Sequence, residues 1–203
     1  MKKIQRALIS VWDKSGLDTF AKKLNECGVE IISSGGTAKY LRDSGLDVKD
    51  VSEVTGFPEM LDGRVKTLHP KIHGGILAIR ENPSHIKDTE TNNIDLIDLV
   101  VVNFYPFEET IKKEGVSFQE TIENIDIGGP TIVRAAAKNF QDVSVIVDSE
   151  DYDLLISNIK DNEIMVDKNL NYTLAKKAFS YVANYDASIS NHLGILKTDN
   201  TKN

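Results

Sequence analysis

The sequence is poor in cysteine and in long apolar runs, and each scarcity excludes a class of protein. Cys27 is the only cysteine among 203 residues, so no intrachain disulfide and no cysteine-based metal cluster is possible. Four scattered histidines give no metal-ligand set either. Runs such as Leu99–Val102 fall far short of the roughly 20 residues that cross a bilayer, and no signal-peptide core follows Met1. We therefore expect a cytoplasmic protein that needs no metal and no membrane.

Basic residues are outnumbered by acidic ones, which argues against nucleic acid as a partner. The chain has 24 Lys and Arg residues against 31 Asp and Glu residues, a formal net charge of -7. The excess of negative charge falls mainly after residue 100, whereas the cations of the first half lie among glycine-rich segments. This distribution predicts a local pocket for a small anion rather than a broad surface for a polyanion.

Hydrophobic periodicity predicts strands that alternate with helices. The patterns indicate strands over 5–11, 29–33, 97–102 and 143–147, and helices over 17–27, 38–43, 131–139, 148–159 and 170–192, with a further short helix after a capping box at 117–120. Pro130 stands where the first residue of its helix is expected. The segment from 51 to 79 holds too many glycines and prolines for long elements and is interpreted as a functional insertion. Alternation of this kind predicts an α/β fold, a mainly parallel sheet flanked by helices on both sides.

The segment Ser34–Thr37, with the sequence SGGT, is a candidate phosphate site. It follows a predicted strand and precedes a predicted helix, so backbone amides and the helix dipole would converge on an anion. A plain βα turn is the alternative, since the segment matches neither of the common nucleotide-binding motifs. Lys14 favours the phosphate site, because the carboxyl ends of neighbouring parallel strands face one crevice, where Ser10 is also expected.

Two further segments carry candidate catalytic groups. Arg64 and Lys66 stand at alternate positions, so an extended backbone would point both to one side, although a solvated basic loop is the alternative. Asp126 precedes a predicted helix and is either a cap or a catalytic carboxylate. Tyr105 follows a predicted strand at its carboxyl end and is either a site donor or a packing residue. Trp12 is expected in the core.

Five segments together resemble the inosine monophosphate (IMP) cyclohydrolase domain of the bifunctional purine-biosynthesis protein. Their order and spacing match over nearly the whole chain, and the third is highly specific. They are Ser10–Lys14, Ser33–Thr37, Gly63–Gly75, Asn103–Phe107 and Asn124–Pro130.

The resemblance implies a fold, an organisation and a set of partners. The fold would be the methylglyoxal synthase-like α/β fold, with a cyclohydrolase domain over 1–196 and a linker-like tail over 197–203 that precedes a formyltransferase domain absent from this chain. The protein would form a homodimer, bind a purine nucleoside monophosphate and use no cofactor or metal.

The implied reaction closes the purine ring of 5-formamidoimidazole-4-carboxamide ribotide with loss of water, giving IMP in the last step of purine synthesis. By the same resemblance, the 5′-phosphate would be held by Ser10, Lys14, Ser34, Gly36 and Thr37. The base and carboxamide would be held by Arg64, Thr67, Asn103, Ile127 and Gly128, and the proton transfers and oxyanion would fall to Lys66, Tyr105, Asp126 and Lys138. Which of these last four gives or takes each proton stays open.

Two other functions suit the same fold. A methylglyoxal synthase would also need a phosphate loop and an aspartate, but it would lack the Lys66-centred motif and the segment after Val102. A nucleotide-sensing regulatory domain, like that of carbamoyl phosphate synthetase, would need no catalysis. The expected convergence of Lys66, Tyr105, Asp126 and Lys138 favours an enzyme.

Overall fold

Five parallel strands form the central sheet of the molecule. The computed structural model describes residues 2–160 and 163–195. Every neighbouring pair in this sheet is parallel, and Ile9 in the middle strand lies opposite Ser33 on one side and Val101 on the other. In spatial order the strands are β4 (Lys49–Asp50), β3 (Glu30–Ser33), β2 (Arg6–Val11), β5 (Leu99–Asn103) and β6 (Ser144–Ile146).

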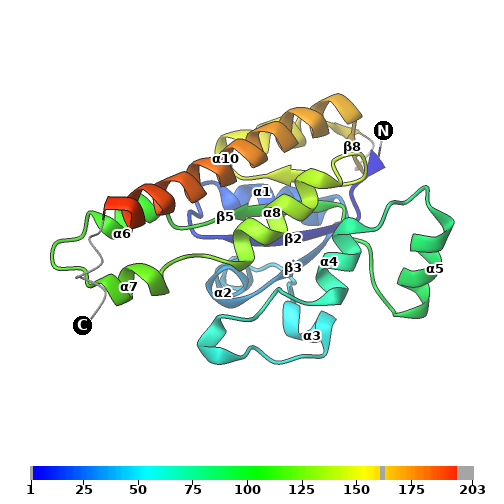
Figure 1. Cartoon of the computed structure of the whole chain (residues 1–203). Helices are drawn as coiled ribbons and strands as arrows, with labels where there is room; N and C mark the ends of the chain where they lie inside the picture. The colour runs from blue at the N-terminus through cyan, green and yellow to red at the C-terminus, as the bar shows by residue number, and fades with distance from the viewer. Residues whose placement is uncertain (1, 161–162, 196–203) are drawn as a thin grey trace.

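Helices cover both faces of this sheet, as the alternating pattern predicts (Figure 1). Successive side chains of a strand point to opposite faces. Ile9 and Val101 therefore enter one core, while Leu8 and Val100 enter the other, and all four are fully buried. The first core is covered by α1 (Leu17–Glu26), α2 (Gly35–Asp43) and α9 (Tyr152–Ile156), and the second by α4 (Pro70–Leu77), α8 (Gly128–Lys138) and α10 (Lys168–Ile195).

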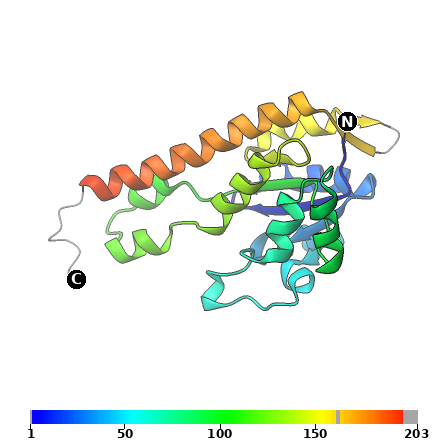
Figure 2. The same cartoon turned by 45° about the vertical axis from the view of Figure 1, so that its right-hand side comes forward.

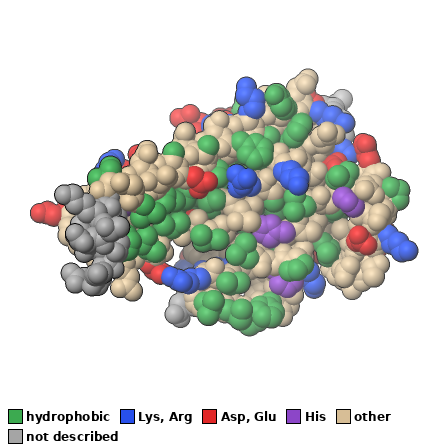
Figure 3. Space-filling view, viewed as in Figure 1, with side chains coloured by type: hydrophobic (Ala, Val, Ile, Leu, Met, Phe, Trp, Pro, Cys, Tyr) green, Lys and Arg blue, Asp and Glu red, His purple; other side chains and the backbone are tan. Residues whose placement is uncertain are grey.

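The far end of α10 leaves the sheet together with two short helices. Figure 2 shows α6, α7 and the carboxyl-terminal half of α10 extending beyond the sheet. Figure 3 shows hydrophobic side chains at this end of the molecule. The remaining helices are α3 (Val51–Thr55), α5 (Pro83–Thr91), α6 (Phe107–Ile111) and α7 (Phe118–Glu123), with short 3₁₀ turns at Leu61–Gly63 and Ser149–Asp151.

Three strands make a second, antiparallel sheet that sequence patterns do not predict. Their order is β1-β8-β7, with β1 at Lys2–Lys3, β8 at Glu163–Val166 and β7 at Ile159–Lys160. The prediction of one helix over 148–159 is therefore wrong, because α9 ends at Ile156 and Ile159 pairs with Ile164. Pairing between the first and the last quarter of a chain depends on tertiary structure and leaves no local signal.

Several boundaries and one burial prediction also differ from the sequence analysis. The capping box at Ser117 is present, but α8 begins at Gly128, so Pro130 is its third residue. A proline fits there because the amides of the first turn have no partner within the helix. Trp12 is 53% exposed rather than in the core. The tail over 197–203 lies outside the described residues.

Within the described residues, no helix combines the length and the apolarity that crossing a bilayer requires.

Candidate active site

A cavity of about 850 Å³ opens at the carboxyl ends of β2 and β5. This size is typical of small-molecule sites, and the carboxyl edge is where open parallel sheets bind ligands. We call it the central cavity. Its walls include nine of the residues proposed from the sequence: Ser10, Ser34, Arg64, Lys66, Thr67, Asn103, Asp126, Ile127 and Gly128.

The first turn of α2 follows Ser34, which lines one side of this cavity. Ser34 is the residue before the helix, and its side chain makes no capping hydrogen bond. Gly35 has a φ of 55°, a left-handed conformation that favours glycine. Gly35 and Gly36 are exposed, so the unpaired amides and the positive end of the helix dipole are open to an anion.

Lys14 lies beside this first turn. Its ammonium is 3.4 Å from the Val11 carbonyl oxygen, which also accepts the Thr37 hydroxyl at 2.9 Å. The Val11 amide in turn donates to the Thr37 hydroxyl oxygen. The Thr37 side chain is therefore engaged with β2, which leaves only its amide for a ligand. Lys14, Gly36 and Thr37 do not line the central cavity itself.

The basic loop that carries Arg64 and Lys66 is turned rather than extended. A 3₁₀ turn precedes Arg64, whose own backbone is helical, so the extended backbone assumed in the sequence analysis is absent, although both residues line the central cavity. The Arg64 Nε donates to Glu123 Oε1 at 2.8 Å, and Lys66 Nζ lies 3.0 Å from Glu59 Oε1. The Arg64 guanidinium lowers the pKa of Glu123, and Glu123 raises the pKa of Arg64.

Glycine allows Lys66 to approach both its partner and α2. Gly63 has a φ of 89°, and a Cβ there would lie 2.7 Å from Lys66 Cε. Lys66 Nζ is also 3.7 Å from the place that a Cβ on Gly35 would occupy. The ammonium of Lys66 therefore sits between the basic loop and the first turn of α2.

Asp126 is half-buried at the start of α8. Its Oδ1 accepts the Gly129 amide at 2.9 Å, as a helix cap would, while the residue also lines the central cavity. Burial raises the pKa of Asp126, and the Gly129 and Gly128 amides act in the opposite direction. The sequence leaves open whether Asp126 is a helix cap or a reactive carboxyl. The geometry makes the two roles compatible.

Asn103 has its side-chain amide occupied within the protein. Its Oδ1 accepts the amides of Trp12 and Asp13 at 2.8 and 3.0 Å, and its Nδ2 donates to the Asp13 carbonyl at 3.2 Å. Asn103 thus fixes the loop after β2 that carries Lys14. The Nδ2 group has a second N–H besides the one bonded to Asp13, so Asn103 can donate to a purine base while these bonds persist.

Tyr105 and Lys138 do not join Lys66 and Asp126 in the central cavity. The Tyr105 ring packs edge-on against Trp12 at 4.9 Å between centroids, and the Lys113 ammonium lies 5.0 Å from it. Lys138 is exposed at the last residue of α8. At 1.5 Å per residue it stands about 15 Å along the axis from Gly128. The expected convergence of all four groups is therefore absent within this chain.

Sequence patterns missed four residues that contact the site residues or their neighbours. Glu59 and Glu123 pair with the basic loop, and no local signal identifies them. Tyr181 and Tyr185 on α10 bond to the main chain of Phe104 and Asp126. Their spacing of four residues does place them on one face of the predicted helix.

Two other features of the described residues were considered as sites: a second hollow and clusters of metal ligands. A second hollow of about 880 Å³ lies along the edge formed by β3 and β4 and contains none of the proposed site residues. Over the ranges 2–160 and 163–195, no three His, Cys, Asp or Glu side chains gather as metal ligands.

Comparison with known proteins identifies the family. The family model for the MGS-like domain matches residues 16–131. The chain belongs to the MGS-like domain family. A second family model, for the AICARFT/IMPCHase bienzyme, matches residues 136–203 of this MGS-like chain.

The relatives of this MGS-like chain include purine-biosynthesis proteins. It is 55% identical over 199 residues to the bifunctional purine biosynthesis protein PurH of Magnetococcus marinus, and 53% identical over 196 residues to PurH of Polynucleobacter asymbioticus. The matches cover 98% and 97% of this chain but only 37% of each relative. Among solved structures, the crystal structure of ForH aligns with a TM-score of 0.81 and 34% identity, covering 94% of this chain and 97% of the other.

Proposed function

We propose that this chain has IMP cyclohydrolase activity and closes the purine ring of 5-formamidoimidazole-4-carboxamide ribotide. The observation that carries the proposal is that Lys66 and Asp126 line one cavity with Ser34, the residue that precedes the open first turn of α2. An anion site, a cation and a carboxyl of raised pKa are the groups that this reaction needs. The names of the relatives supply the context of purine biosynthesis.

The 5′-phosphate belongs at the first turn of α2 in this proposal. The amides of Gly35, Gly36 and Thr37 would donate to its oxygens, with Lys14 adding charge from the neighbouring loop. The imidazole ring would then extend into the central cavity, toward the basic loop and the start of α8. The cavity measures about 850 Å³, and cavities of this size bury roughly 70–90% of the surface of a drug-sized ligand.

The chemistry joins two groups of one molecule. The carboxamide nitrogen attacks the formyl carbon, a C–N bond forms, and one proton passes from this nitrogen to the formyl oxygen, giving a carbinolamine. The formamido nitrogen then gives up its proton, a C=N bond forms, the C–O bond breaks, and the oxygen leaves as water. Folding both groups together in the cavity supplies proximity. Lys66 stabilises the oxygen as it becomes negative, and Asp126 exchanges the proton, since burial raises the pKa of its carboxyl and makes it a stronger base than an exposed carboxylate.

The proposal extends to the organisation of the longer protein. Residues 1–196 would form the cyclohydrolase domain, followed by the tail over 197–203 and a fused formyltransferase domain. This chain spans 37% of the length of its PurH relatives, which leaves room for that domain in a longer polypeptide. We further propose a cytoplasmic homodimer.

An absorbance assay tests the activity directly. The purified chain is mixed with the formylated ribotide, and the appearance of the purine chromophore is followed. Turnover by the isolated chain supports the proposal. Tight binding of IMP without turnover would instead identify a nucleotide-sensing domain, and release of inorganic phosphate from dihydroxyacetone phosphate would identify a methylglyoxal synthase.

Replacement of the two cations of the basic loop should affect different kinetic constants. Lys66→Ala should lower kcat by about ten- to a hundredfold with little change in KM, because its charge is needed only as the oxyanion forms. Arg64→Ala should mainly raise KM, because a guanidinium fork holds a neutral carbonyl in the ground state. Steady-state kinetics separates the two, with exposed Lys87→Ala on α5 as the control. A normal kcat in Lys66→Ala would make Lys66 a binding residue.

Removal of the charge beside α2 should weaken binding of the phosphate. Lys14→Ala should raise KM by about ten- to a hundredfold at moderate ionic strength, since one charge-assisted contact is lost. Lys39→Ala, on the outer face of α2, removes the same charge away from the site and should change KM little. Calorimetric titration measures the affinity of each variant for IMP. Equal affinities for the two variants would place the phosphate elsewhere.

A further inference from the structure

Asp126 is anchored on two sides, and one anchor comes from a distant helix. Its carboxyl oxygen accepts the Gly129 amide, while its own amide donates to the hydroxyl oxygen of Tyr185 at 2.8 Å. Tyr185 belongs to α10, 59 residues further along the chain. Only 7% of this tyrosine is exposed, so its hydroxyl has little freedom to leave the Asp126 amide.

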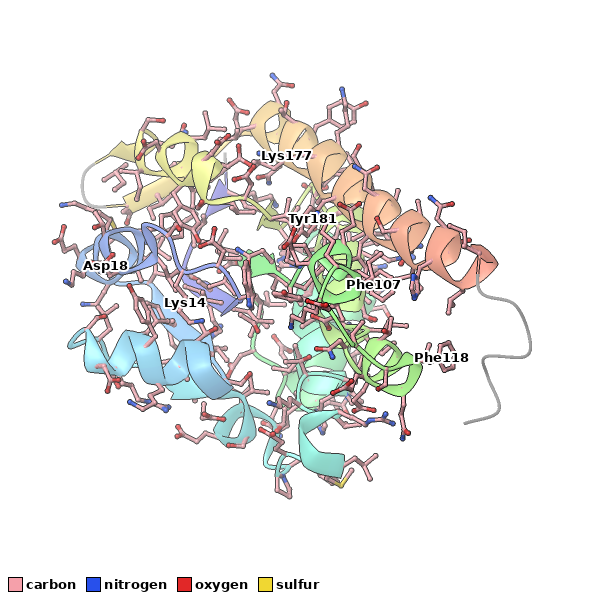
Figure 4. All side chains as sticks on the ribbon, turned by 90° about the vertical axis from the view of Figure 1, so that its left-hand side faces the viewer. Lys14, Asp18, Phe107, Phe118, Lys177 and Tyr181 are labelled. Atoms are coloured by element: carbon pink, nitrogen blue, oxygen red, sulfur yellow. The ribbon has the colours of Figure 1, made fainter. Side chains whose placement is uncertain are left out.

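A cluster of rings holds that hydroxyl in place. The Tyr185 ring packs edge-on against Phe104 at 4.5 Å and against Phe107 at 6.4 Å between centroids. Tyr181, one turn earlier on α10, packs on Phe104 and bonds to both its amide and its carbonyl at 3.3 Å. Figure 4 shows Tyr181 on α10 above Phe107 on α6.

The same cluster reaches the other anchor of Asp126. A Cβ on Gly129 would lie 2.9 Å from Phe104 Cδ1, so the Phe104 ring presses directly on the residue whose amide holds the Asp126 carboxyl. Both anchors of Asp126 therefore depend on α10 and Phe104. Neither α10 nor Phe104 contributes a charged group to the central cavity.

The tyrosine hydroxyls stay neutral over the working range of an enzyme. Burial raises the pKa of Tyr185 and of Tyr181, and the carboxylate of Asp126 acts in the same direction on both. Asp186, the next residue of α10, and Tyr181 also raise the pKa of Tyr185. A neutral hydroxyl is a constant acceptor for the Asp126 amide from acidic to alkaline pH.

We propose that Tyr185 is the positioning residue for Asp126: it holds the main chain of Asp126 so that the carboxyl faces the central cavity in its half-buried place. The expected effect on kcat rests on the proposed function. The expected effect on the position of Asp126 does not. Tyr185 touches no substrate and exchanges no proton. Its hydroxyl acts only through the Asp126 amide.

Tyr185→Phe is the test, because it removes the hydroxyl and keeps the ring against Phe104 and Phe107. We expect kcat to fall about tenfold or more with KM within twofold, since a small displacement of a reacting group is enough for such a loss. A less firmly held Asp126 is better hydrated, so the limb of the pH–rate profile that reports it should move to lower pH. The matched control is Tyr152→Phe, which removes another buried hydroxyl, one with no hydrogen-bond partner in the described structure, and should leave kcat and the profile unchanged.

A second readout does not require activity. The carboxyl carbon of Asp126, observed by ¹³C nuclear magnetic resonance in the ligand-free protein, should titrate at lower pH in Tyr185→Phe than in the wild type. An unchanged titration, or an unchanged kcat and pH profile, overturns the inference. A wild type that titrates as expected but does not cyclise the ribotide would overturn the proposed function alone. If Tyr185→Phe does not fold, Tyr181→Phe loosens the same Phe104 segment and should shift both readouts in the same direction by less.

Discussion

Asp126→Asn should lower kcat by about a hundred- to a thousandfold and leave KM nearly unchanged. Asparagine keeps a side-chain oxygen that accepts the Gly129 amide, so the cap at the start of α8 survives. It cannot exchange a proton, and loss of a positioned acid or base commonly costs about 10²–10⁴ in rate. Steady-state kinetics with the formylated ribotide measures the effect. A variant with near-normal kcat would reduce Asp126 to a helix cap.

The same substitution should not weaken the fold at neutral pH. Burial raises the pKa of Asp126 above its value in the unfolded chain, so the ionised carboxylate costs stability once the pH exceeds that unfolded value, about 3.9. Asp126→Asn removes this cost, and its melting temperature at pH 7 should equal or exceed that of the wild type. The difference should vanish as the pH falls below about 3.9, where the carboxyl is protonated in both states. Asp88→Asn, at an exposed position on α5, is the control for both measurements.

Gly75→Ala should be strongly destabilising. Gly75 lies in α4 where the helix meets the chain that leads into β5, and the Ile97 amide donates to its carbonyl at 3.0 Å. A Cβ there would lie well inside the van der Waals radius of the Asp95 carbonyl oxygen and 3.4 Å from Ile97 Cγ1. A main-chain oxygen cannot swing away, so the helix must shift. Overpacking of this kind costs about 1–3 kcal/mol, which corresponds to roughly 2–12 °C in a chain of this size.

Two other glycines provide a comparison for the loss of stability expected in Gly75→Ala. At Gly74 a Cβ would meet the end of the Ile94 side chain at 3.0 Å, and at Gly194 it would meet nothing within 4 Å. Gly74→Ala should therefore lose less stability than Gly75→Ala, because a side-chain end can rotate. Gly194→Ala should lose none, since alanine favours a helix. Thermal unfolding of the three variants tests the order, and equal melting temperatures would contradict it.

The central sheet and half of the site can be predicted from the sequence because both have local causes. A strand such as Leu99–Val102 is apolar at every position because both of its faces are covered. The pairing of Lys14 with the first turn of α2 is predictable because parallel strands end at one edge. These are rules about neighbours in the chain or in the sheet.

The remainder of the site depends on distances that a pattern does not contain. The sequence cannot show that Glu59 and Glu123 fold back onto Lys66 and Arg64, since those pairs depend on the shape of a turn. It similarly cannot show that Tyr185 reaches Asp126 from another helix. The position of Lys138, in contrast, can be predicted from the sequence, because ten helical residues after Gly128 already imply about 15 Å of separation.

The exposed position of Trp12 has a spectroscopic consequence. It is the only tryptophan of the chain, and its amide is held by Asn103 in the wall of the central cavity. Two residues later the same loop carries Lys14 to the first turn of α2. The tryptophan fluorescence of this protein therefore originates from a single indole in the loop that leads to Lys14, and we expect its emission to change when a phosphate binds beside Lys14, without any added label.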